Sequence, residues 1–112
     1  MTKEIRKHLR QHRRKKFNYT GRWYAELDVS QTTWSIYTLS HNRSNDLLTG
    51  TILTKTGNSA TIVGAVNFSK VVTFEVHPYP GGGVCPGRIK RINIDGMRIQ
   101  CDGLWSTAVR ID

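Results

Sequence analysis

Hydrophobic and polar residues alternate with a period of two along most of this chain, from about residue 20 onward. Trp23, Ala25 and Leu27 alternate with Tyr24 and Glu26, which indicates a strand with one buried face. Further runs rich in β-branched and aromatic residues are separated by turn residues. They predict strands over residues 33–40, 47–55, 60–66, 71–76, 88–94, 97–101 and 104–111. The last run either continues the one before it through a bulge or forms an eighth strand.

Seven or eight short sequential strands are typical of one architecture. We expect an all-β fold, an antiparallel up-and-down meander that closes into a barrel and forms one domain over residues 18–112. Closure removes the unpaired sheet edges that favour aggregation. The dipeptide Asp95-Gly96 is the strongest hairpin signal in the chain.

The first 17 residues follow a different pattern, which predicts a basic α-helical arm. Thr2 is a candidate N-cap, Glu4 lies in the first turn, and Ile5 and Leu9 are one turn apart. Eight of the 17 Lys and Arg residues lie in the first 16 positions against this one acid, a net charge of +7, so only +2 of the total +9 belongs to the rest. The candidate polyanion-binding residues are Arg6, Lys7, Arg10, Arg13, Arg14, Lys15 and Lys16.

This charge suggests two classes of partner for the arm. Nucleic acid is one, because each neutralised phosphate contributes a salt-dependent, sequence-independent attraction. An anionic membrane surface is the other, because cations near such a surface contribute about 1 kcal/mol each. A solvated tail without a partner is the competing interpretation. The state of oligomerisation does not follow from the sequence.

Other function classes find little support. The chain has no run of 18 apolar residues and no apolar stretch after its basic start, so we expect a cytoplasmic protein that the arm could hold at a membrane. Two cysteines without a CxxC spacing and four scattered histidines predict neither a metal site nor a cofactor. No enclosed pair of acid and base groups is evident, so we expect a protein that is not an enzyme.

The Asp95-Gly96 turn also predicts which side chains face the barrel interior. A two-residue turn places Ile94 opposite Met97 and Ile92 opposite Ile99, and strict alternation then puts Lys90 and Arg88 on the same inward face. Two cations directed toward a barrel mouth suggest a site for a phosphate or carboxylate. The competing interpretation is that both side chains reach water at the rim.

Three aromatic residues complete the candidate ligand site. We expect Trp23, Trp34 and Trp105 to fill a narrow barrel as core residues, with one of them lining a ligand cavity as the alternative. Tyr37 could stack on a base or sugar. Arg88, Lys90, Trp23, Trp34 and Tyr37 are therefore the candidate ligand-binding residues.

Glycines and aromatic residues recur in order along the expected strands. The segments are Gly21-Arg22-Trp23-Tyr24, Leu48-Thr49-Gly50-Thr51, Ile62-Val63-Gly64-Ala65-Val66 and Gly103-Leu104-Trp105. This succession resembles the calycins, the lipocalin and avidin-like barrels, and the resemblance implies a small anionic or amphipathic ligand. Asn18-Tyr19-Thr20-Gly21-Arg22-Trp23 after a basic segment is also similar to the start of the β-barrel sensor of CBASS-type antiviral effectors, which implies a nucleotide ligand.

Overall fold

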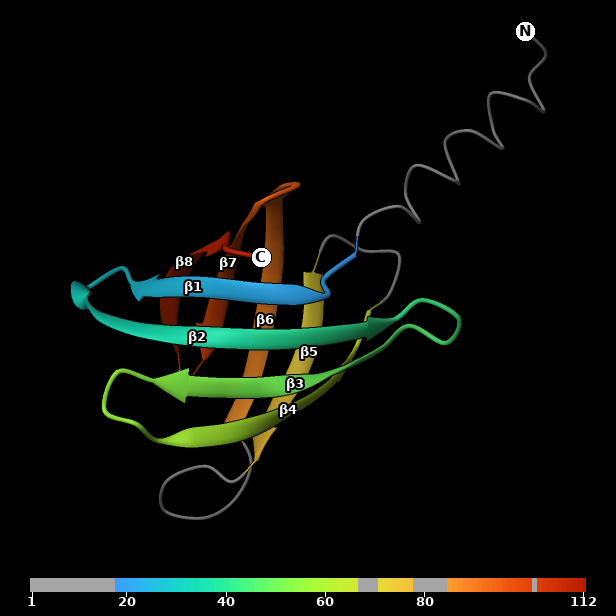
Figure 1. Ribbon diagram of the computed structural model, residues 1–112, viewed down its shortest axis with the longest axis horizontal. Coiled ribbons are helices and arrows are strands. Elements are labelled where there is room, and N and C mark those ends of the chain that lie inside the picture. Colours follow the sequence, from blue (N-terminus) through green and yellow to red (C-terminus); the bar gives the residue numbers. More distant parts are fainter. Residues whose placement is uncertain (1–17, 67–70, 78–84, 102) are drawn as a thin grey trace, which may run out of the picture.

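The computed structural model describes residues 18–66, 71–77, 85–101 and 103–112, which form a closed antiparallel barrel (Figure 1). Each strand pairs with the next in sequence, and the last pairs with the first. The strands are β1 (Gly21–Leu27), β2 (Ser30–Asn42), β3 (Leu47–Thr54), β4 (Ser59–Ala65), β5 (Val71–His77), β6 (Cys85–Asn93), β7 (Gly96–Cys101) and β8 (Leu104–Arg110).

The predicted all-β meander is confirmed, and the eighth-strand alternative is the correct one. The basic helix predicted over residues 1–17 lies outside the described residues, and the described part of the chain contains no helix.

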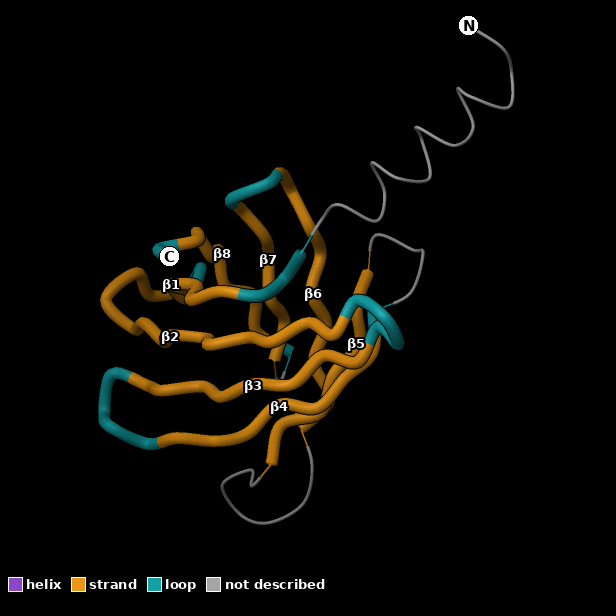
Figure 2. Tube along the Cα trace, turned by 45° about the vertical axis from the view of Figure 1, so that its right-hand side comes forward, coloured by secondary structure: helices purple, strands orange, loops and turns teal. Residues whose placement is uncertain are grey.

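Figure 1 shows β1–β4 crossing the front of the barrel, with β5–β7 running behind them at a steep angle. Figure 2 shows the C-terminus beside β8 and β1, where the barrel closes.

The core lies inside the barrel and is apolar. On β1 the inward residues Trp23 and Ala25 are 0% and 2% exposed, as their alternation predicts. The inward positions of the other strands continue this core, with Tyr37, Leu39, Leu48, Ile52, Ile62, Val72, Phe74, Val76, Ile89, Met97, Ile99 and Ala108. Burial of this apolar surface is the main force that favours folding.

The β6–β7 hairpin has a different register from the predicted one. Its turn lies one residue earlier, because the Asn93 side-chain oxygen accepts a hydrogen bond of 3.0 Å from the Asp95 N–H and pairs Asn93 with Gly96. A register irregularity between Arg91 and Asn93 then places Ile89 opposite Ile99. The displaced turn alone would leave the same residues facing inward, but the extra residue at this irregularity moves the side chains of the preceding part of β6 to the opposite face.

The predicted inward face of β6 is therefore wrong. Ile92 and Ile94 are 56% and 73% exposed, whereas Ile89 is fully buried. Arg88 and Lys90 alternate with Ile89 and lie exposed on the outside of the barrel. Any anion that they bind must approach the outer wall.

Candidate functional site

Arg88 lies at the edge of an open hollow on the outer wall of the barrel. The hollow has a volume of about 960 Å³ and spans β4–β7. Its lining residues are Val63, Gly64, Ala65, Thr73, Phe74, Glu75, Gly87, Arg88, Gln100 and Gly103. Short side chains dominate this set, which explains why the wall is hollowed there.

Two glycines make the wall thin at this position. Gly64 and Gly87 flank Phe74 on the two neighbouring strands, and Phe74 points into the core with 3% of its surface exposed. A Cβ atom at Gly87 would lie far inside van der Waals contact with the Phe74 ring. The Phe74 ring therefore covers the inner side of Gly87, and the Phe74 Cβ lies close to Gly64, while both glycines border the hollow.

Polar groups of both kinds line the hollow. Arg88 supplies guanidinium donors, Glu75 carboxylate acceptors, and Gln100 an amide that can donate and accept. Arg88 forms no hydrogen bond or ion pair with another described residue, whereas Glu75 has a partner of its own. The Arg88 guanidinium is thus available to a ligand from solvent.

The register places further cations and an aromatic ring beside the hollow. Thr73, Arg88, Gln100 and Trp105 are directly opposite one another along β5–β8. Lys90 is directly opposite Arg98 on the same outer face. Arg98 forms an ion pair with Asp28, whereas Arg88 and Lys90 form none with a described residue.

Arg98 lies between Lys90 and the Trp105 ring on the outer face of the barrel. Its guanidinium carbon lies 5.4 Å from the centre of the Trp105 ring, a cation–π distance, and the guanidinium also pairs with the Asp28 carboxylate. Thr107 donates a 3.0 Å hydrogen bond to the other oxygen of Asp28. These contacts hold Arg98 and Trp105 in a fixed arrangement on the outside of the barrel.

Trp34 is the second tryptophan that the structure places outside rather than in the core. It alternates with the buried residues of β2, and its ring lies 6.1 Å from the ring of Tyr24 on β1. The prediction that Trp34 and Trp105 fill the barrel is therefore wrong. A period of two assigns residues to two faces but does not say which face is buried when both carry aromatic side chains.

Trp23 and Tyr37 lie inside the barrel, directly opposite each other on β1 and β2, and are 0% and 5% exposed. The Trp23 indole N–H donates a 3.0 Å hydrogen bond to the Tyr19 carbonyl. Arg110 stacks on the other side, with its guanidinium carbon 4.3 Å from the Trp23 ring centre. Trp23 is thus held as a core residue, far from Arg88 in the register of the sheet.

Arg110 is a structural residue that the sequence pattern did not reveal. Its guanidinium donates hydrogen bonds to the carbonyls of Thr20, Asn18 and Ile94, at 2.6, 2.9 and 3.2 Å, and lies 3.4 Å from an Asp95 oxygen. It therefore joins the segment before β1, the turn after β6 and the end of β8. This closes the end of the barrel at which residue 18 enters.

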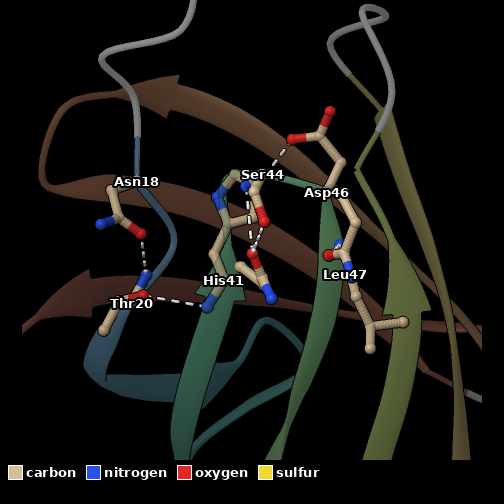
Figure 3. A network of polar contacts seen from close by, with 8 residues as sticks. Asn18, Thr20, His41, Ser44, Asp46 and Leu47 are labelled. Atoms are coloured by element: carbon tan, nitrogen blue, oxygen red, sulfur yellow. Dashed lines mark hydrogen bonds and ion pairs between the residues drawn. The ribbon is translucent and has the colours of Figure 1, made fainter.

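A polar network surrounds His41 at the same end (Figure 3). The His41 backbone N–H donates to the Thr20 hydroxyl at 2.9 Å, and its Nε2 lies 3.1 Å from an Asp46 oxygen. The His41 side chain is 4% exposed, and its Nδ1 is buried without a hydrogen-bond partner. Because an ionised carboxylate only accepts, the Asp46 contact favours the tautomer with the proton on Nε2.

Tyr19 packs beside this network, with its ring 5.6 Å from that of His41. Burial raises the pKa of the Tyr19 phenol, and the positive charge of Arg91 partly offsets this increase. Asp46 adopts a left-handed φ of 57° in the turn after β2. The network anchors the turn and the entering chain.

The seven arm residues predicted to bind polyanions, Arg6, Lys7, Arg10, Arg13, Arg14, Lys15 and Lys16, lie outside the described residues. No group of three or more His, Cys, Asp or Glu side chains that could hold a metal ion occurs in the described part of the chain. No described helix has the length and apolar character needed to cross a membrane.

The comparisons with protein families, curated proteins and solved structures found no match to this chain.

Proposed function

We propose that this protein is a non-enzymatic binding barrel that takes up an anionic ligand on its outer wall. The observation that carries the proposal is the exposed Arg88 guanidinium at an open hollow of about 960 Å³, without a partner among the described residues. A free guanidinium can form a bidentate pair with a phosphate or carboxylate. Lys90 adds a second positive charge one pleat further along β6.

The closed eight-strand meander is compatible with the proposed calycin-like binding barrel. The proposed site, however, lies on the outer wall and not in a cavity inside the barrel. The inward residues Ile89, Met97 and Ile99 of β6 and β7 are apolar and at most 1% exposed. Transfer of an unpaired anion among such side chains would be strongly unfavourable. The outer wall offers both positive charge and water for the rest of the ligand.

The basic arm would localise the protein. Its net charge of +7 would hold the barrel near a polyanion or an anionic membrane surface in the cytoplasm. The hollow would then select the ligand, because only the barrel presents groups in a fixed arrangement. A nucleotide-sensing role of the kind found in antiviral effectors would use the same Arg88 site.

The test is calorimetric titration of the full chain with inorganic pyrophosphate. We expect Arg88→Gln to weaken binding about tenfold, because a hydrogen bond to a charged group is lost. Arg43→Gln is the matched control, since it removes one exposed charge from the turn after β2. Equal affinities of the two variants would contradict the proposal.

A further inference from the structure

The outer face of β6–β8 combines groups that a simple anion does not require. Arg88, Gln100 and Trp105 lie in one row across three strands, and Lys90 and Arg98 lie in the next row. Adjacent strands are about 4.8 Å apart, so Arg88 and Trp105 are separated by about 10 Å along this face. The row therefore runs from a cation through an amide to an aromatic ring.

We propose that this face binds single-stranded nucleic acid, a conclusion that rests on the anion-binding role of Arg88. Arg88 and Lys90 contact phosphates, and a base stacks against the platform formed by Trp105 and Arg98. Aromatic rings and guanidinium planes both stack on bases, and this stacking is largely independent of sequence. Gln100 lies between the two and can hydrogen-bond to a base edge or a sugar.

The dimensions favour a strand over a free nucleotide. Arg88 and Lys90 are two residues apart on β6, so their Cα atoms are about 7 Å apart and their side chains project from the same face. This separation suits neighbouring phosphates of an extended strand. An open face also encloses a mononucleotide poorly, whereas several weak contacts along a strand add together.

The charge pattern of the barrel favours the same face. Arg88, Lys90 and Arg98 project outward from β6 and β7. Two carboxylates lie near them: Asp28, which pairs with Arg98, and Glu75, which lines the hollow and has a partner of its own. The Trp34–Tyr24 pair on the outer face of β1 and β2, by contrast, lies beside Glu26, which is directly opposite Trp34. A polyanion is repelled there, which makes Trp34 a suitable control position.

The test compares the binding of labelled oligothymidylate and of an abasic oligonucleotide of the same length, measured by fluorescence anisotropy with the full chain. One stacked base is expected to make oligothymidylate bind about 5- to 150-fold tighter. Trp105→Leu should abolish this preference, whereas Trp105→Phe and the control Trp34→Leu should retain it. Near-UV circular dichroism of each variant establishes that the barrel is folded.

The cations are tested in the same assay. Arg88→Gln with Lys90→Gln should weaken binding of both oligonucleotides. It should also make the plot of log association constant against log salt concentration less steep, by about 1.4 in the magnitude of its negative slope. The charge-matched control, Arg43→Gln with Lys55→Gln, removes two cations from other parts of the barrel and should lower the slope less. Thymidine monophosphate should compete only weakly.

Three results would overturn the proposal. The two oligonucleotides could bind equally, Trp105→Leu could leave the preference intact, or thymidine monophosphate could compete as well as the oligonucleotide per mole of nucleotide. If any of these occurs while Arg88→Gln still weakens pyrophosphate binding, the anion-binding function stands and the nucleic-acid assignment alone is wrong. If Arg88→Gln has no effect on either ligand, both are wrong.

Discussion

At the scale of single residues, a few side chains hold the barrel closed at the Asn18 end. Arg110 contacts the face of Trp23 and three backbone carbonyls, and its side chain is only 21% exposed. Arg22, by contrast, pairs with Asp112 at the surface, where the two side chains are 52% and 60% exposed. Water and salt weaken the second interaction far more than the first.

Replacement of these two arginines should therefore have unequal effects. Arg110→Ala should lower the free energy of unfolding by about 2–4 kcal/mol, because several charge-assisted hydrogen bonds and a cation–π contact are lost. Arg22→Ala should cost less than about 1 kcal/mol. Urea denaturation of both variants measures the difference, and equal losses would refute the role assigned to Arg110.

Tyr19 gives the fold a predictable response to alkaline pH. Because burial raises the pKa of its phenol above the ordinary value of 10.0, the folded protein retains this proton more strongly than the unfolded chain does. The contribution of Tyr19 to stability is complete below pH 10 and is lost as pH rises through the higher folded pKa. Tyr19→Phe should remove this part of the pH dependence.

The measurement is the free energy of unfolding of wild type and Tyr19→Phe at several pH values from neutral to strongly alkaline. The other tyrosines and the lysines titrate in both proteins, so the difference between the two curves isolates Tyr19. Parallel curves above pH 10 would show that the Tyr19 pKa is the same in the folded and unfolded states, which would contradict this prediction.

At the scale of the structural elements, most of the strands could be predicted, and so could the inward face of β7 with Met97 and Ile99, but the inward face of β6 could not. The alternation around Trp23 and Ala25 predicted the correct inward face, because polar residues separate them cleanly. In β6, Ile89 and Ile92 are both apolar but have different parity, so the pattern allowed two registers. The irregularity between Arg91 and Asn93 selects the register in which Ile89 faces inward.

This ambiguity also concealed the candidate site. Strict alternation through β6 places Arg88 and Lys90 on the inner face for either position of the turn. Asn93 signals the turn, since Asn favours turns by hydrogen-bonding to backbone two residues on, but the irregularity between Arg91 and Asn93 that reverses the faces has no such signal. Trp105 had no comparable signal, because its position beside Arg98 depends on the pairing of β7 with β8.

The packing of β5 against β6 requires a glycine at position 87, because the Phe74 ring occupies the space of a Cβ atom there. Gly87→Ala should destabilise the barrel by about 1–3 kcal/mol, because the new Cβ would overlap the Phe74 ring. Phe74→Leu should destabilise the native chain but should reduce the additional cost of Gly87→Ala. A thermodynamic cycle of the four proteins measures this coupling, and additive effects would contradict the packing described here.

At the scale of the whole molecule, charge and structure are divided between two parts of the chain. The arm has most of the net charge, whereas residues 18–112 have only +2 and fold into the barrel. The exposed cations Arg88 and Lys90 on β6 therefore matter for the arrangement of charge rather than for its total. In this account the arm provides long-range attraction and the outer wall provides recognition.

The most direct test of anion binding on the outer wall is to map the pyrophosphate site by NMR spectroscopy on the full, ¹⁵N-labelled chain. The account predicts that the Arg88 side-chain N–H signal and the backbone amides of Thr73, Arg88 and Gln100 shift together on titration. In Arg88→Gln the backbone amides should shift only at about tenfold higher pyrophosphate concentration. Changes confined to residues 1–17, or centred on inward residues such as Ile89 and Met97, would contradict it.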